Sequence, residues 1–541
     1  MLEWMGKKKV VNHHNDVPFH VLERKYSFDA SGKHEKDNGS ENMIIHGDNL
    51  VALKSLLPRF EGRVKCIYID PPYNTGEEGW VYNDNVNDPQ IKKWFNKIVG
   101  KEGEDFSRHD KWLCMMYPRL KLLHRLLADD GLLAVSIDDN ELFNLGAMLN
   151  EIFGSQNRLA CAPWMSDPSG GKSKGALRVG HEYLLLYSKG DRSSLSRDER
   201  STGVLNLKDK WGKYRKGREL RKWGANSARA DRPKQWFEIT APDGTKVFPY
   251  KNDGTEGRWR WGKENAGMKV LLSDPEYAHW EKCPYDEGVT VNGESERWVP
   301  FEKVRDEAHT FGWSTWLDKY GHNADGTAEI KAIFGNKTFD TPKPLQLVRW
   351  IVSLYDAEDT LILDSFAGSA TTAHAALQLN KEDGGTRKFI LVELMDYAET
   401  LTAERVRRVI KGYGSDDKKV EGTGGDFSFY ELGPQLMVDG VLNEEVPTEK
   451  IREYVYYTET KQPIGEAEKG DAYKLGVAFG VAYYFCYEKE KSMTLNRTLL
   501  KKIKTKAESY VVYADACTLS AEELEKLHIT FKKIPRDVTR F

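Results

Sequence analysis

Hydrophobic and polar positions alternate along the chain in blocks typical of strand–helix repeats. Short apolar runs, each the length of one buried strand, occur at 43–48, 64–70 and 131–139. Residues 49–60 lie between the first two runs and place leucines at helical spacing, and residues 110–127 do the same before the third. This order predicts β-α-β units, and therefore a doubly wound parallel sheet with helices on its faces.

The alternation stops near residue 190 and returns after residue 341. The segment between carries turn signals such as PDG, NDG and NADG instead of long apolar runs. We therefore expect one α/β domain that is interrupted by an insertion. The predicted divisions are an N-terminal arm, partly ordered at best (1–42), a first α/β half (43–190), the insertion (191–340), a second α/β half (341–412), a linker (413–445) and a small α+β domain (446–541).

Composition narrows the classes of protein that fit. The 541 residues include 80 Lys and Arg against 83 Asp and Glu, a formal net charge of -3, so any surface for nucleic acid must be local. Six cysteines without a CxxC pair argue against a zinc ribbon or a disulfide framework and favour a reducing compartment. His13 and His14 lack a partner cluster, so we predict no metal site. Without an apolar stretch of about 18 residues, the chain is expected to be soluble, intracellular and not bound to a membrane.

The apolar run at 64–69 ends in Asp70-Pro71-Pro72-Tyr73. Neither proline has an N–H group, so a rigid, non-helical turn closes a buried strand, at the edge where open α/β sheets bind ligands. A carboxylate, backbone carbonyls and an aromatic ring fit a flat base with an exocyclic amine, because the oxygens accept the amine hydrogens and the ring stacks on the base. The tetrapeptide alone fits a purely structural Asp-Pro turn equally well.

A second strand ends at Asp364 and continues into the small residues SFAGSATT and a helix. Small side chains let backbone N–H groups approach a ligand, and the helix N-terminus adds its dipole. No lysine follows Gly368, so this loop is not a P-loop. Glu393 ends the next strand, where a carboxylate can hold two ribose hydroxyls. These features predict a site for a nucleoside-bearing cofactor, and close packing alone is the other interpretation of the loop.

The insertion contains a basic, aromatic stretch. Residues 208–234 hold 11 Lys and Arg against three acids, and nine of the fifteen tryptophans fall between 211 and 316. Cations suit phosphates and rings suit stacking, which favours a nucleic-acid surface over a solvated face with structural tryptophans. The candidate DNA-binding residues are Lys213, Arg215, Lys216, Arg218, Arg221, Lys222 and Trp223.

Five motifs occur in one order: GDN (47–49), DPPY (70–73), TPKP (341–344), FAGSATT (366–372) and VE (392–393). In this order the chain resembles, over roughly 43–410, the amino-methyltransferases of the β class that act on DNA. Its length and extra C-terminal region most resemble the modification subunit of a type III restriction–modification system. The resemblance implies a Rossmann-like sheet with permuted motif order, S-adenosylmethionine as cofactor and a target-recognition region in the insertion.

The resemblance also implies roles for individual residues. Asp70 and the Pro71 carbonyl would accept hydrogen bonds from the N6 amine of adenine, and Tyr73 would stack on the flipped base. Of the implied cofactor ligands, Glu393 would bind the ribose hydroxyls. The family loop usually has a second glycine where this chain has Ala370. The implied catalytic residues are Asp70, Pro71, Pro72 and Tyr73. The implied cofactor-binding residues are Asp48 and Asn49 at the adenine, Lys343 and Pro344 at the methionine end, and Asp364, Phe366, Gly368, Ser369, Thr371 and Glu393.

The implied partners are double-stranded DNA, a second copy of the chain in a homodimer, and a restriction subunit with the helicase and nuclease motifs that this sequence lacks. The implied location is the prokaryotic cytosol or nucleoid. Three alternatives stay open at this point. They are an N4-cytosine methyltransferase, for which the family favours Ser in place of Asp70, a DNA-binding specificity subunit that serves a partner nuclease or helicase, and a methyltransferase for RNA or a small molecule.

Overall fold

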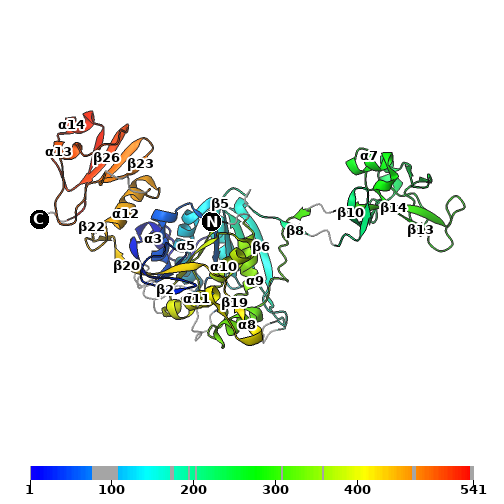
Figure 1. Ribbon diagram of the computed structural model, residues 1–541, viewed down its shortest axis with the longest axis horizontal. Helices are drawn as coiled ribbons and strands as arrows, with labels where there is room; N and C mark the ends of the chain where they lie inside the picture. Colours follow the sequence, from blue (N-terminus) through cyan, green and yellow to red (C-terminus); the bar gives the residue numbers. More distant parts are fainter. Residues whose placement is uncertain are drawn as a thin grey trace. The chain divides into compact units, whose positions relative to one another are not determined.

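The computed structural model describes residues 2–75, 108–170, 176–192, 195–200, 204–305, 309–355, 359–465 and 471–536. The chain divides into two compact units, which are drawn in Figure 1. Unit 1 comprises residues 1–196 and 314–541, and unit 2 comprises residues 197–313. No helix within the described ranges is both long and apolar enough to cross a membrane.

Unit 1 is built on a ten-stranded sheet with the order β2-β1-β20-β3-β17-β16-β4-β5-β7-β6. The strands from β20 to β5 run parallel, whereas β7 is antiparallel to both of its neighbours and β1 is antiparallel to β20. The predicted α/β fold is confirmed, with antiparallel strands added at both sides of the parallel centre. The strands are β1 (His20–Asp29), β2 (Gly32–His34), β3 (Met43–His46), β4 (Val64–Ile69), β5 (Leu127–Ile137), β6 (Arg158–Met165), β7 (His181–Ser188), β16 (Leu361–Asp364), β17 (Lys388–Glu393) and β20 (Asp426–Gln435).

Helices cover this sheet because its central strands are apolar on both faces. In β4, five of the six residues are buried, as expected of a parallel strand covered from both sides. Helices α3, α5 and α6 share one hydrophobic core with β3, β4 and β5, and α9 packs against α10. The helices are α3 (Asn49–Phe60), α5 (Arg108–Leu126), α6 (Leu142–Phe153), α8 (Asn323–Phe334), α9 (Leu345–Ser353), α10 (Thr371–Asp383) and α11 (Glu404–Lys411).

Strands β4 and β16 are neighbours in the sheet although they come from opposite halves of the chain, and Ile362 pairs with Cys66. From β4 the chain passes through α5 to β5 on one side. From β16 it passes through α10 to β17 on the other side. The loops after β4 and β16 therefore diverge, and such a switch point forms a ligand-binding crevice at the carboxyl edge of an open α/β sheet.

The structure differs from the sequence prediction on both flanks of the sheet. The predicted arm 1–42 contains β1 and β2, and the predicted linker 413–445 contains β20. Strand β1 pairs with β20 in a register that places Ser27 opposite Ser428. Both strands are only half buried, so neither shows a long apolar run. Their pairing also joins the two ends of the α/β domain, which local sequence patterns do not reveal.

Residues after 446 form a smaller sheet with the order β23-β24-β26-β28. Strands β24, β26 and β28 are parallel, and β23 is antiparallel to β24. Its core includes Ile451, Phe485 and Ile534. The elements are α12 (Thr448–Thr460), β23 (Lys474–Ala478), β24 (Val481–Phe485), α13 (Arg497–Leu500), β26 (Ser509–Ala514), α14 (Ala521–Lys526) and β28 (Ile529–Lys533).

Unit 2 has its own four-stranded sheet, with the order β13-β14-β10-β9, and its described residues include the α-helix α7 (Ala266–Ser273). Its core surrounds Trp259, which is 1% exposed and donates its indole N–H to the Phe237 carbonyl at 2.8 Å. Part of the tryptophan enrichment in the insertion is therefore structural. The strands are β9 (Leu207–Asp209), β10 (Gly212–Glu219), β13 (His279–Pro284) and β14 (Glu296–Val304).

Candidate active site

The Asp-Pro-Pro-Tyr turn follows β4 directly and is held from two sides. Trp112 of α5 is buried and donates its indole N–H to the Pro72 carbonyl at 2.6 Å. Asn74 follows the turn in the left-handed region, with φ 58°, and its amide donates to Oε1 of the fully buried Glu141 at 2.5 Å. Since two prolines also fix the backbone, the orientation of Asp70 is set before any ligand binds.

Asp70 presents one occupied and one unoccupied carboxylate oxygen. Its Oδ2 accepts a hydrogen bond from Nζ of Lys343 at 2.8 Å. Its Oδ1 is buried and has no hydrogen-bond partner within the described part of the chain. Burial raises the pKa of Asp70, and the Lys343 ammonium opposes that rise. A buried acceptor without a donor costs about 1–3 kcal/mol, so a ligand that donates to Oδ1 is favoured here.

Tyr73 is joined to a carboxylate that the sequence analysis missed. Its hydroxyl donates to Oε2 of Glu182 at 2.9 Å. Glu182 lies near the start of β7, and its Oε1 accepts a hydrogen bond from the Asn323 amide at 3.3 Å. Lys343 Nζ lies 3.5 Å from Glu182 Oε2 and 4.8 Å from the centroid of the Tyr73 ring. The available signal was an acid that opens the apolar strand HEYLLLYS.

The loop after β16 is folded by Asp364 itself. Asp364 Oδ1 accepts from the backbone amide of Phe366 at 3.0 Å, and Oδ2 accepts from the Thr372 hydroxyl at 2.6 Å. Burial raises the pKa of Asp364 to about 7. This carboxylate therefore stabilises the conformation of the predicted cofactor loop through two hydrogen bonds to residues of the loop and of α10. Ala370 has φ 64°, a region that favours glycine, which explains why the family usually has glycine at this position.

Glu393 lies beside that loop at the end of β17. Its Oε2 accepts from the Gly368 amide at 2.7 Å, and its Oε1 accepts from the Met395 amide at 3.0 Å. Burial raises the pKa of Glu393 to about 7. Ionised oxygens have room for further donors after these two bonds, as a ligand with hydroxyl groups requires.

The GDN motif ties the two halves of the domain together. The Asn49 amide donates to the Ser365 carbonyl at 3.1 Å, and its Oδ1 accepts from Nε of the buried Arg119 at 2.6 Å. Asp48 caps α3 by accepting from the Leu50 amide at 2.8 Å. These side chains are engaged by the protein, and their predicted contact with the adenine of a cofactor stays a prediction.

Further side chains hold the loop where α10 begins. Arg405 of α11 is buried and donates to the Ser369 hydroxyl at 3.0 Å and to the Thr371 hydroxyl at 2.8 Å. Thr371 in turn donates to the Lys343 carbonyl at 3.4 Å, so the residue before Pro344 contacts the loop. The predicted cofactor residues therefore share one edge of the sheet with the Asp-Pro-Pro-Tyr turn.

The residues at this edge fit S-adenosylmethionine. The Ser365 hydroxyl is buried without a hydrogen-bond partner in the described chain, which leaves a polar group available in the loop. Glu393 offers a carboxylate for hydroxyls, and α10 presents its N-terminus to the same edge. Metal ligands are not gathered here: no cluster of three or more His, Cys, Asp or Glu suited to a metal ion occurs among the residues described.

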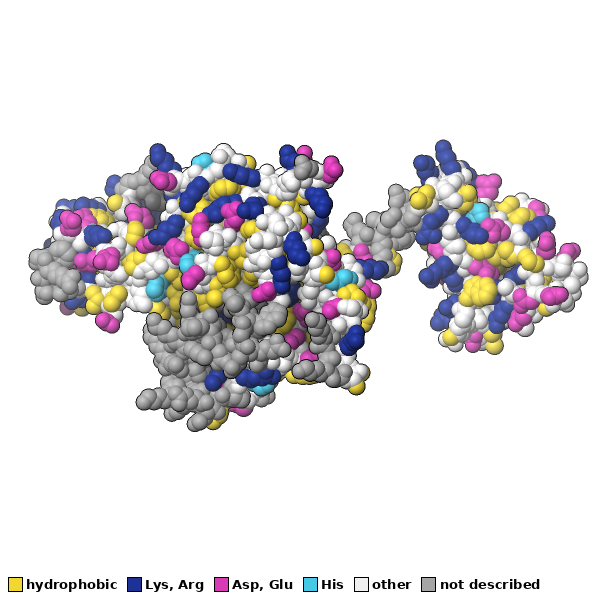
Figure 2. Space-filling model, turned by 90° about the horizontal axis from the view of Figure 1, so that it is seen from below, with side chains coloured by type: hydrophobic (Ala, Val, Ile, Leu, Met, Phe, Trp, Pro, Cys, Tyr) yellow, Lys and Arg dark blue, Asp and Glu magenta, His cyan; other side chains and the backbone are white. Residues whose placement is uncertain are grey.

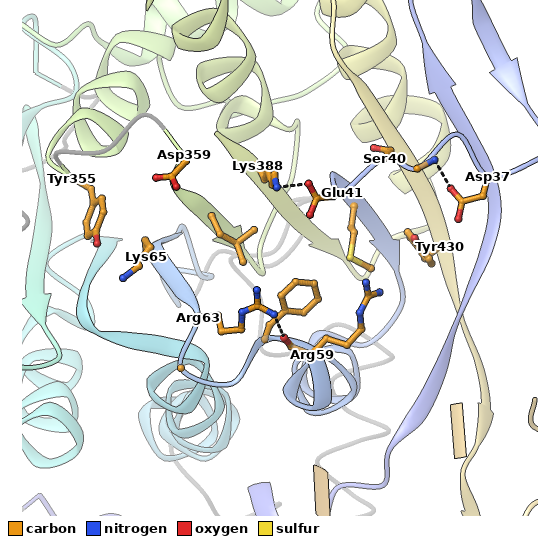
Figure 3. A pocket seen from close by; sticks show the side chains of 15 residues that line it. Asp37, Ser40, Glu41, Arg59, Arg63, Lys65, Tyr355, Asp359, Lys388 and Tyr430 are labelled. Atoms are coloured by element: carbon orange, nitrogen blue, oxygen red, sulfur yellow. Dashed lines mark hydrogen bonds and ion pairs between the residues drawn. The ribbon is translucent and has the colours of Figure 1, made fainter. Parts of the chain in front are cut away.

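A cavity of about 850 Å³ lies at the opposite edge, where the parallel strands begin (Figure 3). Met43, Leu361 and Lys388 at the amino ends of β3, β16 and β17 line it. At this cavity Lys388 forms an ion pair with Glu41. The motifs and this cavity are on different edges, so the chemistry is assigned to the carboxyl edge.

In unit 2 the predicted DNA-binding residues lie within β10 and in the turn after it. Lys213 and Arg218 are exposed, and Lys216 pairs with Glu281 at 2.8 Å. Arg215 is half-buried and Lys222 is half-buried in the following turn. Basic and hydrophobic side chains lie side by side on the face of this unit that Figure 2 shows.

Arg221 is a correction to the predicted DNA-binding set. Its side chain is 3% exposed and makes two hydrogen bonds to Glu219, at 2.7 and 3.2 Å. It also lies 4.2 Å from the centroid of the Trp223 ring. Its charge is therefore used inside unit 2, because burying an arginine requires such a partner. Trp223 remains 55% exposed although its indole donates to Glu219.

Comparisons with known proteins show which family the chain resembles. The DNA methylase family N6_N4_Mtase matches residues 64–404. The EcoPI Mod subunit, a type III restriction–modification enzyme of Escherichia phage P1, is 31% identical over 72% of this chain and 63% of its own length. The type II methyltransferase M.KpnI of Klebsiella pneumoniae is 35% identical over 66% of this chain and 81% of its own. The solved PvuII DNA methyltransferase, which is cytosine-N4-specific, aligns over 68% of this chain and 86% of its own with 14% identity and a TM-score of 0.31.

The chain belongs to the DNA methylase family. The resemblance predicted from the five motifs is confirmed, and S-adenosylmethionine is the cofactor that this membership assigns to the chain. The chain spans less than two thirds of the length of the phage P1 subunit.

Proposed function

We propose that this chain is a site-specific methyltransferase that modifies the N6 amine of adenine in double-stranded DNA. The observation that carries the proposal is the buried Oδ1 of Asp70, which has no hydrogen-bond partner among the described residues and belongs to the same rigid turn as Tyr73. An exocyclic amine supplies the missing donor, and a base supplies the face that the ring can stack on. The GDN and cofactor loops lie at the same edge of the sheet.

The proposed mechanism depends on how Asp70 binds the amine. An adenine amine is a poor nucleophile because its lone pair is delocalised into the ring. Asp70 and the Pro71 carbonyl accept its two hydrogens, turn it toward tetrahedral geometry and free the lone pair. S-adenosylmethionine supplies, when bound, the electrophilic methyl group. The rigid turn holds the amine in place, and such positioning provides much of the rate.

The target base must leave the duplex to reach this turn. Base flipping costs a few kcal/mol in unstacking and unpairing. Stacking on Tyr73 returns about 1–3 kcal/mol of that cost. Lys213, Arg218 and Trp223 of unit 2 are exposed and support a role for that unit in contacts with DNA.

We further propose that the chain is a modification subunit that forms a homodimer and works with a restriction subunit in the prokaryotic cytosol or nucleoid. The similarity to the EcoPI Mod subunit supports this assignment. Size-exclusion chromatography with light scattering tests the homodimer, and a mass of one chain would contradict it.

Sequencing of modified bases in DNA from cells that express this chain tests the central proposal. We expect N6-methyladenine at one sequence motif. N4-methylcytosine at that motif would instead identify cytosine as the target base of the enzyme. Absence of any methyl mark would contradict methyl transfer and favour a DNA-binding specificity subunit.

A further inference from the structure

One ammonium group lies between two carboxylates in the active site. Nζ of Lys343 is 2.8 Å from Oδ2 of Asp70 and 3.5 Å from Oε2 of Glu182. The exposed fraction of the Lys343 side chain is 8%. The three residues come from distant parts of the chain, namely the turn after β4, strand β7 and the segment before α9. The resemblance implies a place for Lys343 at the methionine end of the cofactor, and in the structure its ammonium also contacts the Asp-Pro-Pro-Tyr turn.

This ammonium lies where the target base is proposed to bind. It donates to the carboxylate of Asp70 that is proposed to accept the adenine amine. It also lies over one face of the Tyr73 ring, 4.8 Å from the centroid. A base that donates to Oδ1 of Asp70 can stack on this face of Tyr73 only after the ammonium has moved.

A second position for the ammonium is already prepared. Glu182 Oε2 is within ion-pair distance of Lys343, and the Tyr73 hydroxyl and the Asn323 amide hold the two oxygens of Glu182 in place. Moving the ammonium toward Glu182 keeps it paired, which matters because an unpaired buried charge costs several kcal/mol. The Tyr73 ring remains fixed by the same carboxylate.

We propose that Lys343 is a displaceable occupant of the base site, and that Glu182 receives its ammonium when the target base enters. Lys343 and Glu182 are then positioning residues for base binding, and Asp70 keeps its contact with the amine. Movement of the ammonium from the Tyr73 ring toward Glu182 involves no covalent step. This inference rests on the proposed function of the same site.

The test uses the full chain and three variants: Glu182→Gln, Lys343→Met and the double variant. The probe is a duplex that carries the motif read from methylated DNA, with 2-aminopurine at the target position, whose fluorescence rises when the base leaves the stack. Glu182→Gln keeps an acceptor for Tyr73 but removes the charge that receives Lys343. We expect it to lower base occupancy and raise KM for DNA by roughly tenfold, a change of about 1.4 kcal/mol.

The double variant provides the decisive comparison. Without the ammonium no displacement is required, so adding Lys343→Met to Glu182→Gln is expected to restore the occupancy of the base to within about twofold of Lys343→Met alone. A merely structural role predicts instead that the second substitution adds to the first defect. Occupancy of the double variant at or below that of Glu182→Gln would overturn the inference.

Two controls separate other causes. Tyr73→Phe removes the hydroxyl bond to Glu182 without changing any charge, and a defect that equals that of Glu182→Gln and is not relieved by Lys343→Met would assign the effect to Tyr73 and overturn the inference. A denaturant unfolding midpoint equal to that of the unmodified chain verifies that each variant is folded. A parent chain that leaves no methyl mark on DNA would overturn the proposed function. If the parent chain methylates DNA but the double variant does not restore the occupancy of the base, only the displacement of Lys343 is overturned.

Discussion

The backbone amide of Gly368 donates a 2.7 Å hydrogen bond to Oε2 of Glu393. This bond joins the predicted cofactor loop to the end of the neighbouring strand, so the carboxylate that is predicted to accept the ribose hydroxyls is fixed against the loop. Glu393 is 2% exposed, and burial raises its pKa to about 7. Its ionisation therefore falls in an accessible pH range.

The affinity for S-adenosylmethionine is expected to rise with pH because only the ionised Glu393 can accept freely from two hydroxyls. With a pKa of about 7, the ionised fraction increases roughly tenfold between pH 6 and pH 8. Calorimetric titration should show a Kd about tenfold lower at pH 8. Glu393→Gln should bind weakly at both pH values, and Glu421→Gln at an exposed position should behave as the parent. A Kd of the parent chain that is independent of pH would contradict this role.

The same carboxyl predicts the pH dependence of stability in the absence of cofactor. The folded-state pKa of Glu393 is raised to about 7 from an ordinary value of 4.5, so the folded chain binds more protons than the unfolded chain between these values. The favourable contribution of this carboxyl to the free energy of unfolding is present below pH 4.5 and is lost as pH rises through 7. Glu393→Gln should therefore raise the free energy of unfolding at pH 8, by up to about 3 kcal/mol, and change it little at pH 4.5. Denaturant unfolding at both pH values measures this, and equal effects would contradict it.

Tyr73 is expected to act through its ring. Tyr73→Ala should lower kcat/KM by about 5- to 150-fold, which corresponds to 1–3 kcal/mol of lost stacking. Tyr73→Phe keeps the ring and loses only the bond to Glu182, so its methyl transfer should stay within about tenfold of the parent. Incorporation of tritiated methyl groups measures both variants. A Phe variant as impaired as the Ala variant would assign the role to the hydroxyl.

Trp112 supports the catalytic turn through one hydrogen bond. Trp112→Phe removes the donor to the Pro72 carbonyl and leaves that carbonyl buried. We expect a loss of about 1–3 kcal/mol in the free energy of unfolding and reduced methyl transfer. Trp4→Phe is the matched control, because the Trp4 indole bonds to the Cys114 thiol away from the turn. Transfer by the Trp112 variant that equals transfer by the Trp4 variant would contradict this support.

Unit 2 offers a matched comparison between exposed and buried basic residues. Lys213→Ala and Arg218→Ala should each reduce the salt dependence of DNA binding by about one unit of slope, as loss of one phosphate contact does. Arg221→Ala should leave that slope unchanged and destabilise unit 2, because it removes two hydrogen bonds and the ion pair from Glu219. Binding isotherms over a range of salt concentrations decide this. A changed slope for Arg221→Ala alone would reverse the assignment.

Local sequence patterns predicted the parts of this fold whose causes are local. The apolar run into Asp70, the small residues after Asp364 and the acid at Glu393 each describe one strand end, and all three strand ends form as predicted. The pairing of β1 with β20 depends on residues about four hundred positions apart, so no local pattern carries it.

The active site shows the same limit. Glu182 has no motif of its own and becomes recognisable only when β7 brings it to Tyr73 and Lys343. Arg221 lies in a basic, aromatic stretch typical of a DNA contact, but its side chain is buried against Glu219. The sequence could not predict this burial, because it does not show which side of a strand or turn is covered.

Methyl transfer by Asp70→Ala tests the central claim most directly. Asp70 is proposed to supply the carboxylate for the target amine and has no predicted contact with the cofactor, so the variant should bind S-adenosylmethionine and DNA as the parent does. Incorporation of tritiated methyl groups into DNA should fall by roughly 100- to 1000-fold, the usual effect of removing a group that acts on the transition state. Undiminished transfer by the folded, cofactor-binding variant would contradict the account.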